Sequence, residues 1–193
     1  MKATILLATL KKTGLSHTET LVEFLTGRME RAGIQPEVIK LVNYEIPPGT
    51  YSDMGDGDQW PGILAKVLAS DIIVFATPIW WSNQSSLMQR AIERFDELHD
   101  YVTAGRPSGL GGKSGGIVIT GDSDGAQSII GNICNFFNGV GLLIPPYATL
   151  SVLWDKHAKD EKPTRESLLS KYERDEAKTA EKMIQQLVSY ART

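Results

Sequence analysis

The sequence is poor in cysteine, histidine and long apolar runs. Among its 193 residues it has one cysteine, Cys134, and three histidines. A lone thiol excludes an internal disulfide and a cluster held by four cysteines, and the apolar stretch around Cys134 favours a structural thiol. No apolar run approaches the roughly 18 residues of a membrane span, and Lys11 and Lys12 interrupt the N-terminal run too early for a signal peptide. We therefore expect a cytoplasmic protein with no membrane partner.

The sequence also lacks an excess of either charge and a set of clustered metal ligands. It has 20 basic and 23 acidic residues and a net charge of −3, which is too balanced for a nucleic-acid-binding surface. His99 and His157 lie in polar segments with no second ligand nearby. Asp53, Asp56 and Asp58 lack the glycine and the closing glutamate of a calcium loop, so we interpret them as part of a solvated loop. Neither a nucleic-acid partner nor a metal ion is expected.

The sequence does contain a regular alternation of short apolar runs and amphipathic stretches. The pattern predicts strands at residues 4–8, 37–42, 72–75, 117–120 and 147–154. Helical periodicity marks residues 21–32, 61–69, 87–98, 129–140 and one long final helix over residues 168–188. Strands that alternate with helices predict one α/β domain over residues 1–193, in which helices cover both faces of a five-stranded parallel sheet.

The segment of residues 70–95 is the most informative part of the chain. It joins a buried strand to an amphipathic helix through the loop Pro78-Ile79-Trp80-Trp81-Ser82-Asn83. Open α/β sheets bind their ligands beyond the carboxyl ends of the strands, where this loop is expected to lie. Core packing could explain two adjacent tryptophans, but a wall for a flat aromatic ligand explains them better beside Ser82 and Asn83.

Two further loops are expected at the same edge of the sheet. The loop of residues 9–18 combines hydroxyls, lysines and free amides before a helix N-terminus, which suits a phosphate, although Ser16 or Thr18 could simply cap that helix. The loop of residues 120–125 has small residues that let the backbone approach a ligand, although a turn and helix cap would look the same. Residues 107–114 nearly match a nucleotide P-loop. A proline replaces its first glycine and a strand follows, so Lys113 is expected only to bound that strand.

Taken together, the three loops resemble those of the flavodoxin-like NAD(P)H-dependent FMN reductase and NAD(P)H quinone oxidoreductase family. The resemblance covers residues 3–154 and matches the family in the order and spacing of its motifs. It is carried by Ala8-Thr9-Leu10-Lys11 with His17-Thr18, by Thr77-Pro78-Ile79-Trp80-Trp81 with Ser86-Leu87-Met88-Gln89, and by Gly112 to Gly116 leading into Thr120-Gly121. Departures occur in the first loop, where Ala8, Leu10, Lys11 and His17 replace the usual Gly, Pro, Arg and Asn.

The resemblance implies a doubly wound sheet with strand order 2-1-3-4-5 and a bound FMN. In this interpretation Thr9, Ser16, His17 and Thr18 hold the phosphate and Lys11 adds charge. The ring is flanked by two sets of residues, which are Pro78, Ile79, Trp80, Trp81, Ser82 and Asn83, and Thr120, Gly121, Asp122, Asp124 and Gly125. The family members that carry an iron–sulfur cluster have cysteines in the loop corresponding to residues 43–60, and this loop has none.

The resemblance also implies an activity. A flavoprotein of this family would pass hydride from NADPH or NADH through FMN to a small acceptor such as a quinone or a flavin, with the flavin and no protein side chain as the catalytic group. A homodimer or homotetramer is expected. The alternative is a flavodoxin-like electron carrier or an FMN-binding regulatory module that does not turn over NAD(P)H.

Overall fold

The computed structural model describes residues 1–121, 124–154 and 162–191. Two residues named above, Asp122 and His157, lie outside these ranges. Among the described residues, no helix is long and apolar enough to cross a membrane.

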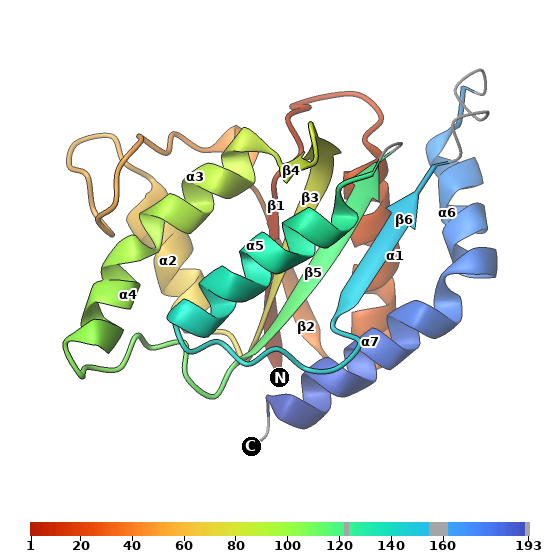
Figure 1. The fold of residues 1–193 in the computed structure, drawn as a ribbon. Helices are drawn as coiled ribbons and strands as arrows, with labels where there is room; N and C mark the ends of the chain where they lie inside the picture. The colour runs from red at the N-terminus through yellow and green to blue at the C-terminus, as the bar shows by residue number, and fades with distance from the viewer. Residues whose placement is uncertain (122–123, 155–161, 192–193) are drawn as a thin grey trace.

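A parallel sheet forms the centre of the molecule (Figure 1). Its strands are β1 (Lys2–Leu7), β2 (Gln35–Lys40), β3 (Ile72–Trp80), β5 (Ser114–Gly121) and β6 (Thr149–Leu153), and they lie in the order β2-β1-β3-β5-β6. Each of these neighbouring pairs is parallel. In chain order this is 2-1-3-4-5, which confirms the predicted flavodoxin-like sheet.

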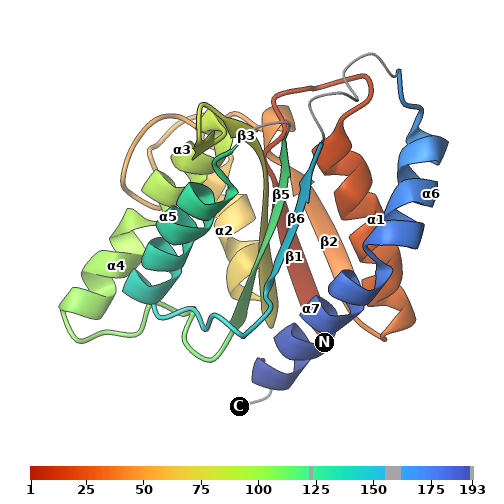
Figure 2. The ribbon, with the colours of Figure 1, turned by 45° about the vertical axis from the view of Figure 1, so that its right-hand side comes forward.

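Helices cover both faces of the sheet, and Figure 2 shows the two layers on either side of it. One layer consists of α1 (His17–Arg31), α6 (Arg165–Asp175) and α7 (Ala177–Tyr190). The other consists of α2 (Trp60–Leu68), α3 (Ser86–Arg94), α4 (Asp96–Thr103) and α5 (Ala126–Gly139), and a short 3₁₀ turn, η1 (Leu41–Asn43), follows β2. Each layer buries its own apolar cluster against the sheet. The sheet therefore has two cores, as an all-parallel sheet requires.

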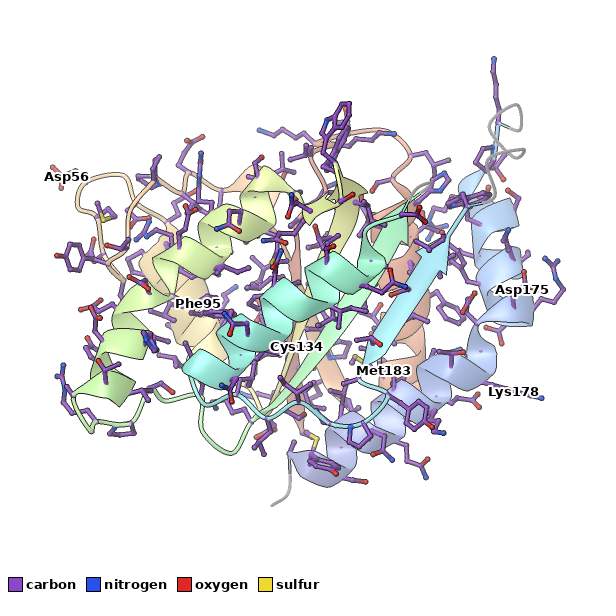
Figure 3. All side chains as sticks on the ribbon, in the orientation of Figure 1. Asp56, Phe95, Cys134, Asp175, Lys178 and Met183 are labelled. Carbon is purple, nitrogen blue, oxygen red and sulfur yellow. The ribbon has the colours of Figure 1, made fainter. Side chains whose placement is uncertain are left out.

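Two helices predicted as continuous are each divided in the structure. The predicted helix at 87–98 breaks at Phe95 into α3 and α4, and the one at 168–188 breaks at Glu176 into α6 and α7. Both joint residues have ψ near −4°, and the helix axis changes direction at each joint (Figure 1). Phe95, labelled in Figure 3, is buried at its joint, and its ring centroid lies 4.8 Å from that of Trp60. Apolar periodicity continues across both joints because it depends on which residues are buried. It does not depend on the direction of the helix axis.

The long loop of residues 43–60 also differs from the prediction. Asp53 and Asp56 are exposed, as expected for a solvated loop, and Figure 3 shows Asp56 at the edge of the molecule. The side chain of Asp58 is instead fully buried and forms an ion pair with Arg94 at the end of α3, with a distance of 2.5 Å between Arg94 Nη2 and Asp58 Oδ2. The interpretation of this aspartate as solvated is therefore wrong. The local sequence does not indicate the ion pair, because the two residues are 36 positions apart.

Lys113 has the structural role that was expected of it. Its Nζ donates hydrogen bonds to the backbone carbonyls of Leu68 and Ser70, at 2.8 and 2.7 Å. Strand β5 begins at the next residue, Ser114. The segment of residues 107–114 therefore leads into a strand, whereas a nucleotide P-loop leads into a helix.

Candidate functional site

The loops that follow β1, β3 and β5 come together at the carboxyl edge of the sheet. Ser85, just after the second loop, donates from Oγ to the carbonyl of Ala8 in the first, at 2.7 Å. The hydroxyls of Thr18 and Thr120 lie 2.6 Å apart and join the first loop's helix to the end of β5. These contacts link segments that are 77 and 102 residues apart in the chain. The topology therefore brings the predicted site residues into one region.

The hydroxyls of the first loop form a small buried network. Ser16 donates from Oγ to Thr9 Oγ1 at 2.9 Å and accepts from the amide of Glu19 at 3.3 Å, so it caps α1. Thr9 Oγ1 also accepts from the amide of Lys11 at 3.3 Å. Thr9 therefore accepts two hydrogen bonds while its own proton has no acceptor among the described residues. Its hydroxyl is available to a ligand, whereas that of Ser16 is committed to the cap.

The donor set of the first loop suits an anion. No aspartate or glutamate precedes Glu19 in the chain. The amides of His17 and Thr18 open helix α1 and donate to no acceptor among the described residues, and a helix N-terminus carries partial positive charge. Lys11 is exposed, and its Nζ donates to the carbonyl of Leu15 at 2.8 Å. Amides, a hydroxyl and cations without a carboxylate among them fit a phosphate group.

His17 is held by residues that the sequence did not predict as part of the site. Its ring centroid lies 4.5 Å from that of Trp154, which directly follows β6, and Lys171 Nζ of α6 lies 4.5 Å from the same Trp154 ring. Tyr172 donates its hydroxyl to the carbonyl of His17 at 3.4 Å. Burial lowers the pKa of His17, and the positive charges of Lys11 and Lys171 lower it further. The position of Trp154 at the end of the last strand could have indicated that it belongs to the site. No local sequence pattern indicates this for Lys171.

The two tryptophans lie at the tip of a hairpin. Strand β3 continues to Trp80 and pairs with the short antiparallel strand β4 (Asn83–Gln84), which was not predicted. Trp81 and Ser82 between them have φ values of 50° and 63°. This left-handed conformation is uncommon for residues other than glycine and suits a two-residue hairpin turn. Trp80 is 50% exposed and Trp81 is 93% exposed, so the alternative of core packing is wrong for both.

The third loop lies directly against this hairpin. A Cβ atom added to Gly125, whose φ is 132°, would lie 2.5 Å from Ser82 Cα, so only glycine allows the two loops to approach this closely. Gly121 lies in the same way against the side chain of Ile79. Asn132 of α5 donates from Nδ2 to Asn83 Oδ1 at 3.4 Å.

The remaining predicted site residues lie in the same region. Pro78 is half-buried and opposite Thr120 in the β3–β5 pairing, and Asp124 is exposed. Asp122 lies outside the described residues. The candidate site thus has a cationic, hydroxyl-rich end at the first loop and an aromatic, glycine-lined end at the hairpin. This arrangement fits a flat ring that carries a phosphate tail. Among the described residues, no three His, Cys, Asp or Glu side chains are grouped as a metal ion would require.

Two curated proteins are similar to the chain in sequence. The divalent metal cation transporter MntH of Mycobacterium bovis is 33% identical over 153 residues, which is 77% of this chain and 22% of the transporter. The 8-demethyl-8-aminoriboflavin-5'-phosphate synthase of Streptomyces davaonensis is 28% identical over 158 residues, which is 77% of this chain and 62% of the synthase. The chain therefore spans less than two thirds of the length of either relative.

Several solved structures are similar along the whole chain, and one of them is also similar in sequence. It is the crystal structure of RosB with the bound intermediate 8-demethyl-8-formylriboflavin-5'-phosphate, with a TM-score of 0.80 and 25% sequence identity over 100% of this chain and 79% of RosB. A family model provides the match that decides membership, because it covers most of the chain, from the first strand to the end of β6. Residues 1–153 match the model of the NADPH-dependent FMN reductases, and the chain belongs to this family.

Proposed function

We propose that the protein is an FMN-dependent oxidoreductase that passes hydride from NADPH or NADH through bound FMN to a small acceptor such as a quinone or a free flavin. The observation that carries this proposal is the pairing, at one sheet edge, of an acid-free first loop with an exposed tryptophan hairpin. Family membership supports FMN as the ligand of the first loop and the tryptophan hairpin. Bound FMN supplies the hydride chemistry, so the protein's part is to bind, orient and shield.

The first loop would bind the phosphate end. The amides of His17 and Thr18 and the spare hydroxyl proton of Thr9 would donate to phosphate oxygens, with Lys11 adding positive charge. Ser16 and Thr18 would act mainly by fixing the loop, because their hydroxyls already bond to Thr9 and Thr120. These roles predict that the loop selects a phosphorylated flavin over riboflavin.

The hairpin and the third loop would hold the ring. Trp80 and Trp81 present aromatic surface, and the backbone from Pro78 to Asn83 lies against Gly121 and Gly125. Backbone amides at this end would stabilise negative charge on the reduced ring. No protein acid or base is required for hydride chemistry on bound FMN, and the proton that completes reduction of a quinone would come from solvent.

Anaerobic reduction followed by steady-state kinetics tests this proposal. We expect the yellow FMN-loaded protein to be bleached by NADPH or NADH and then reoxidised by a quinone or by free FMN. Varying NADPH and quinone together should give parallel double-reciprocal lines, as a ping-pong reaction requires. Intersecting lines would contradict alternate use of one site. A protein that binds FMN but is not bleached would be an electron carrier or a regulatory module instead.

A second candidate function follows from the full-length likeness to RosB and from the similarity to the Streptomyces davaonensis synthase. In that case FMN would be the substrate and would leave the site chemically altered. Mass spectrometry separates the two functions when the flavin is extracted after incubation with NADPH and a quinone and, in parallel, after incubation with oxygen and an amino donor. We expect an unchanged FMN mass, and a stoichiometric change at the ring would favour the second candidate.

We also propose that the protein acts in the cytoplasm as a homodimer or homotetramer. The apolar side chains of Leu10, Trp80 and Trp81 are exposed at the rim of the site, which favours their partial cover by a second copy. Light scattering coupled to size-exclusion chromatography should give a mass two or four times that of the chain. A monomer at micromolar concentration would contradict this part of the proposal.

A further inference from the structure

We propose that His17 takes up a proton when the FMN phosphate binds beside it, so that this chain distinguishes FMN from riboflavin partly through the charge of one imidazole. The inference rests on the proposed function, because it assumes that the first loop holds the phosphate. It concerns a position at which this chain departs from the family pattern, since His17 stands where an asparagine is usual.

The position of His17 places its ring at the entrance to helix α1. It is the first residue of that helix, directly after the cap Ser16, and one of the two amides that open the helix is its own. The half-buried ring packs at 4.5 Å against Trp154, with an interplanar angle of 57°. Trp154 is anchored in turn, because its amide donates to the carbonyl of Gly121 at 2.7 Å. The imidazole is therefore held in place and is not a freely rotating surface side chain.

Among the described residues, the two charged groups that shift the pKa of His17 are both positive. Lys11 approaches from the first loop and Lys171 from α6, and the helix N-terminus adds partial positive charge. Tyr172 of α6 bonds to the His17 carbonyl and stays neutral, because burial and Glu176 raise its pKa. Glu19, two residues along the helix, is paired with Lys40 at 2.7 Å.

Burial and the surrounding positive charge favour the neutral form of the imidazole when no ligand is bound. Burial together with Lys11 and Lys171 lowers the pKa of His17 below its ordinary value. A phosphate monoester carries nearly two negative charges at pH 7.5, and an anion close to an imidazole favours its charged form. Phosphate binding would thus reverse the sign of the local field and draw a proton from the buffer. Riboflavin lacks the phosphate and would leave the ring neutral.

Calorimetry measures this proton directly. FMN is titrated into flavin-free protein at pH 7.5 in buffers of different ionisation enthalpy, and the slope of binding enthalpy against buffer enthalpy gives the number of protons bound. We expect the wild type to take up a measurable fraction of one proton, because the bound phosphate favours the charged form of His17. His17→Asn should take up none and bind FMN several-fold more weakly. Riboflavin should give no uptake with either protein.

His99→Asn is the matched control, because this exposed histidine contacts the carbonyl of Gly139 on the opposite layer from α1. Its proton uptake should equal that of the wild type. An uptake of zero in the wild type, or an equal uptake in His17→Asn, would overturn the inference.

Proton NMR of the wild type gives a second test that needs no variant. The ring signals of His17 should move toward the imidazolium position when FMN is added at pH 7.5, and they should stay in place with riboflavin. Signals that do not move with saturating FMN would overturn the inference while leaving the proposed function intact. Failure of FMN to bind at all would instead overturn the proposed function, and the inference with it.

Discussion

The two ends of helix α3 support regions of opposite character. At its C-terminal end Arg94, with no exposed side-chain surface, donates to the carboxylate of Asp58 and to the carbonyls of Tyr51 and Pro47. At its N-terminal end α3 follows the hairpin, whose Trp81 is 93% exposed. At one end the polar groups bond to each other, and at the other aromatic surface is exposed.

The comparison indicates which region stabilises the fold and which region is expected to bind the ligand. The Arg94 cluster closes the loop of residues 43–60 with buried, fully hydrogen-bonded charges, which are costly to disturb. The hairpin has two left-handed residues that are not glycine, and such conformations gather at functional sites because the surrounding structure holds them. Changes in the Arg94 cluster should therefore alter folding, and changes in the hairpin should alter ligand binding.

The largest effect on the free energy of unfolding is expected from Arg94→Ala. It leaves the buried carboxylate of Asp58 without its ion-pair partner, and breaking a buried pair in this way costs about 3–5 kcal/mol. Urea denaturation measures the loss. Arg165→Ala is the control, because it removes an exposed ion pair with Glu23 and should cost less than about 1 kcal/mol. Equal losses in the two variants would contradict the claim that the buried Arg94 cluster stabilises the fold more than an exposed ion pair does.

The second largest effect is expected from Gly125→Ala, which adds a Cβ atom 2.5 Å from Ser82 Cα at a φ of 132°. Backbone strain and overpacking together should cost about 2–3 kcal/mol and weaken FMN binding, because the hairpin and the third loop are pushed apart. Gly105→Ala, at a φ of 71° with no atom within 4 Å of the new Cβ and outside the three loops, should show only backbone strain of about 1 kcal/mol. Denaturation and FMN titration of both variants decide whether the contact matters.

Acid should weaken the Arg94 cluster before the hairpin. Burial opposes the ionisation of Asp58, but its bonds from Arg94 and from the amides of Met54 and Trp60 outweigh burial and lower its pKa. This lowered pKa stabilises the folded state above the ordinary carboxyl pKa, and the stabilisation is lost as the pH falls through the lowered value. A single carboxylate gives a slope of at most about 1.4 kcal/mol per pH unit. We expect a shallower slope below pH 4 in Asp58→Asn than in the wild type.

Asp56→Asn provides the control for the acid series, since this exposed aspartate lies in the same loop. Urea denaturation at several pH values between 2.5 and 7 gives the slopes. A wild-type slope in Asp58→Asn and a reduced slope in Asp56→Asn would assign the acid sensitivity to the wrong residue.

The smallest effect on unfolding is expected from Trp81→Ala. A side chain this exposed contributes little packing, so the free energy of unfolding should change by less than about 0.5 kcal/mol. The FMN dissociation constant should nevertheless rise about tenfold, because an aromatic contact contributes about 0.5–1.5 kcal/mol beyond its buried area. Tyr51→Ala removes an exposed aromatic side chain from the loop held by Arg94 and should leave FMN affinity unchanged. Fluorescence titration of the three proteins measures the difference.

Much of the fold could be predicted because it depends on local patterns. The continuous apolar run at residues 72–75 and the alternation of strands and helices predicted a parallel sheet covered on both faces. The strand order, which the structure confirms, followed from the family resemblance. The breaks between helices at Phe95 and Glu176 could not be predicted from the sequence, because neither residue is next to a proline or a glycine that would indicate a helix end. The Arg94–Asp58 pair could not be predicted either, because a buried ion pair between segments distant in the sequence has no local sequence pattern.

The candidate site was predictable to a similar degree. Sheet topology was enough to bring Thr18 to Thr120 and Ser82 to Gly125. Neither the left-handed turn at Trp81 nor the contacts of His17 with Trp154 and Tyr172 follow from spacing, because they depend on how α6 packs against α1. The assignment of each site residue to a part of FMN stays a prediction.

Titration of FMN and of riboflavin into flavin-free wild-type protein tests the central claim most directly. Flavin fluorescence should be quenched with saturation at one FMN per chain, and FMN should bind more tightly than riboflavin because of the first loop. The absence of saturable FMN binding, or equal affinity for the two flavins, would contradict the claim that the first loop and the hairpin together form an FMN site.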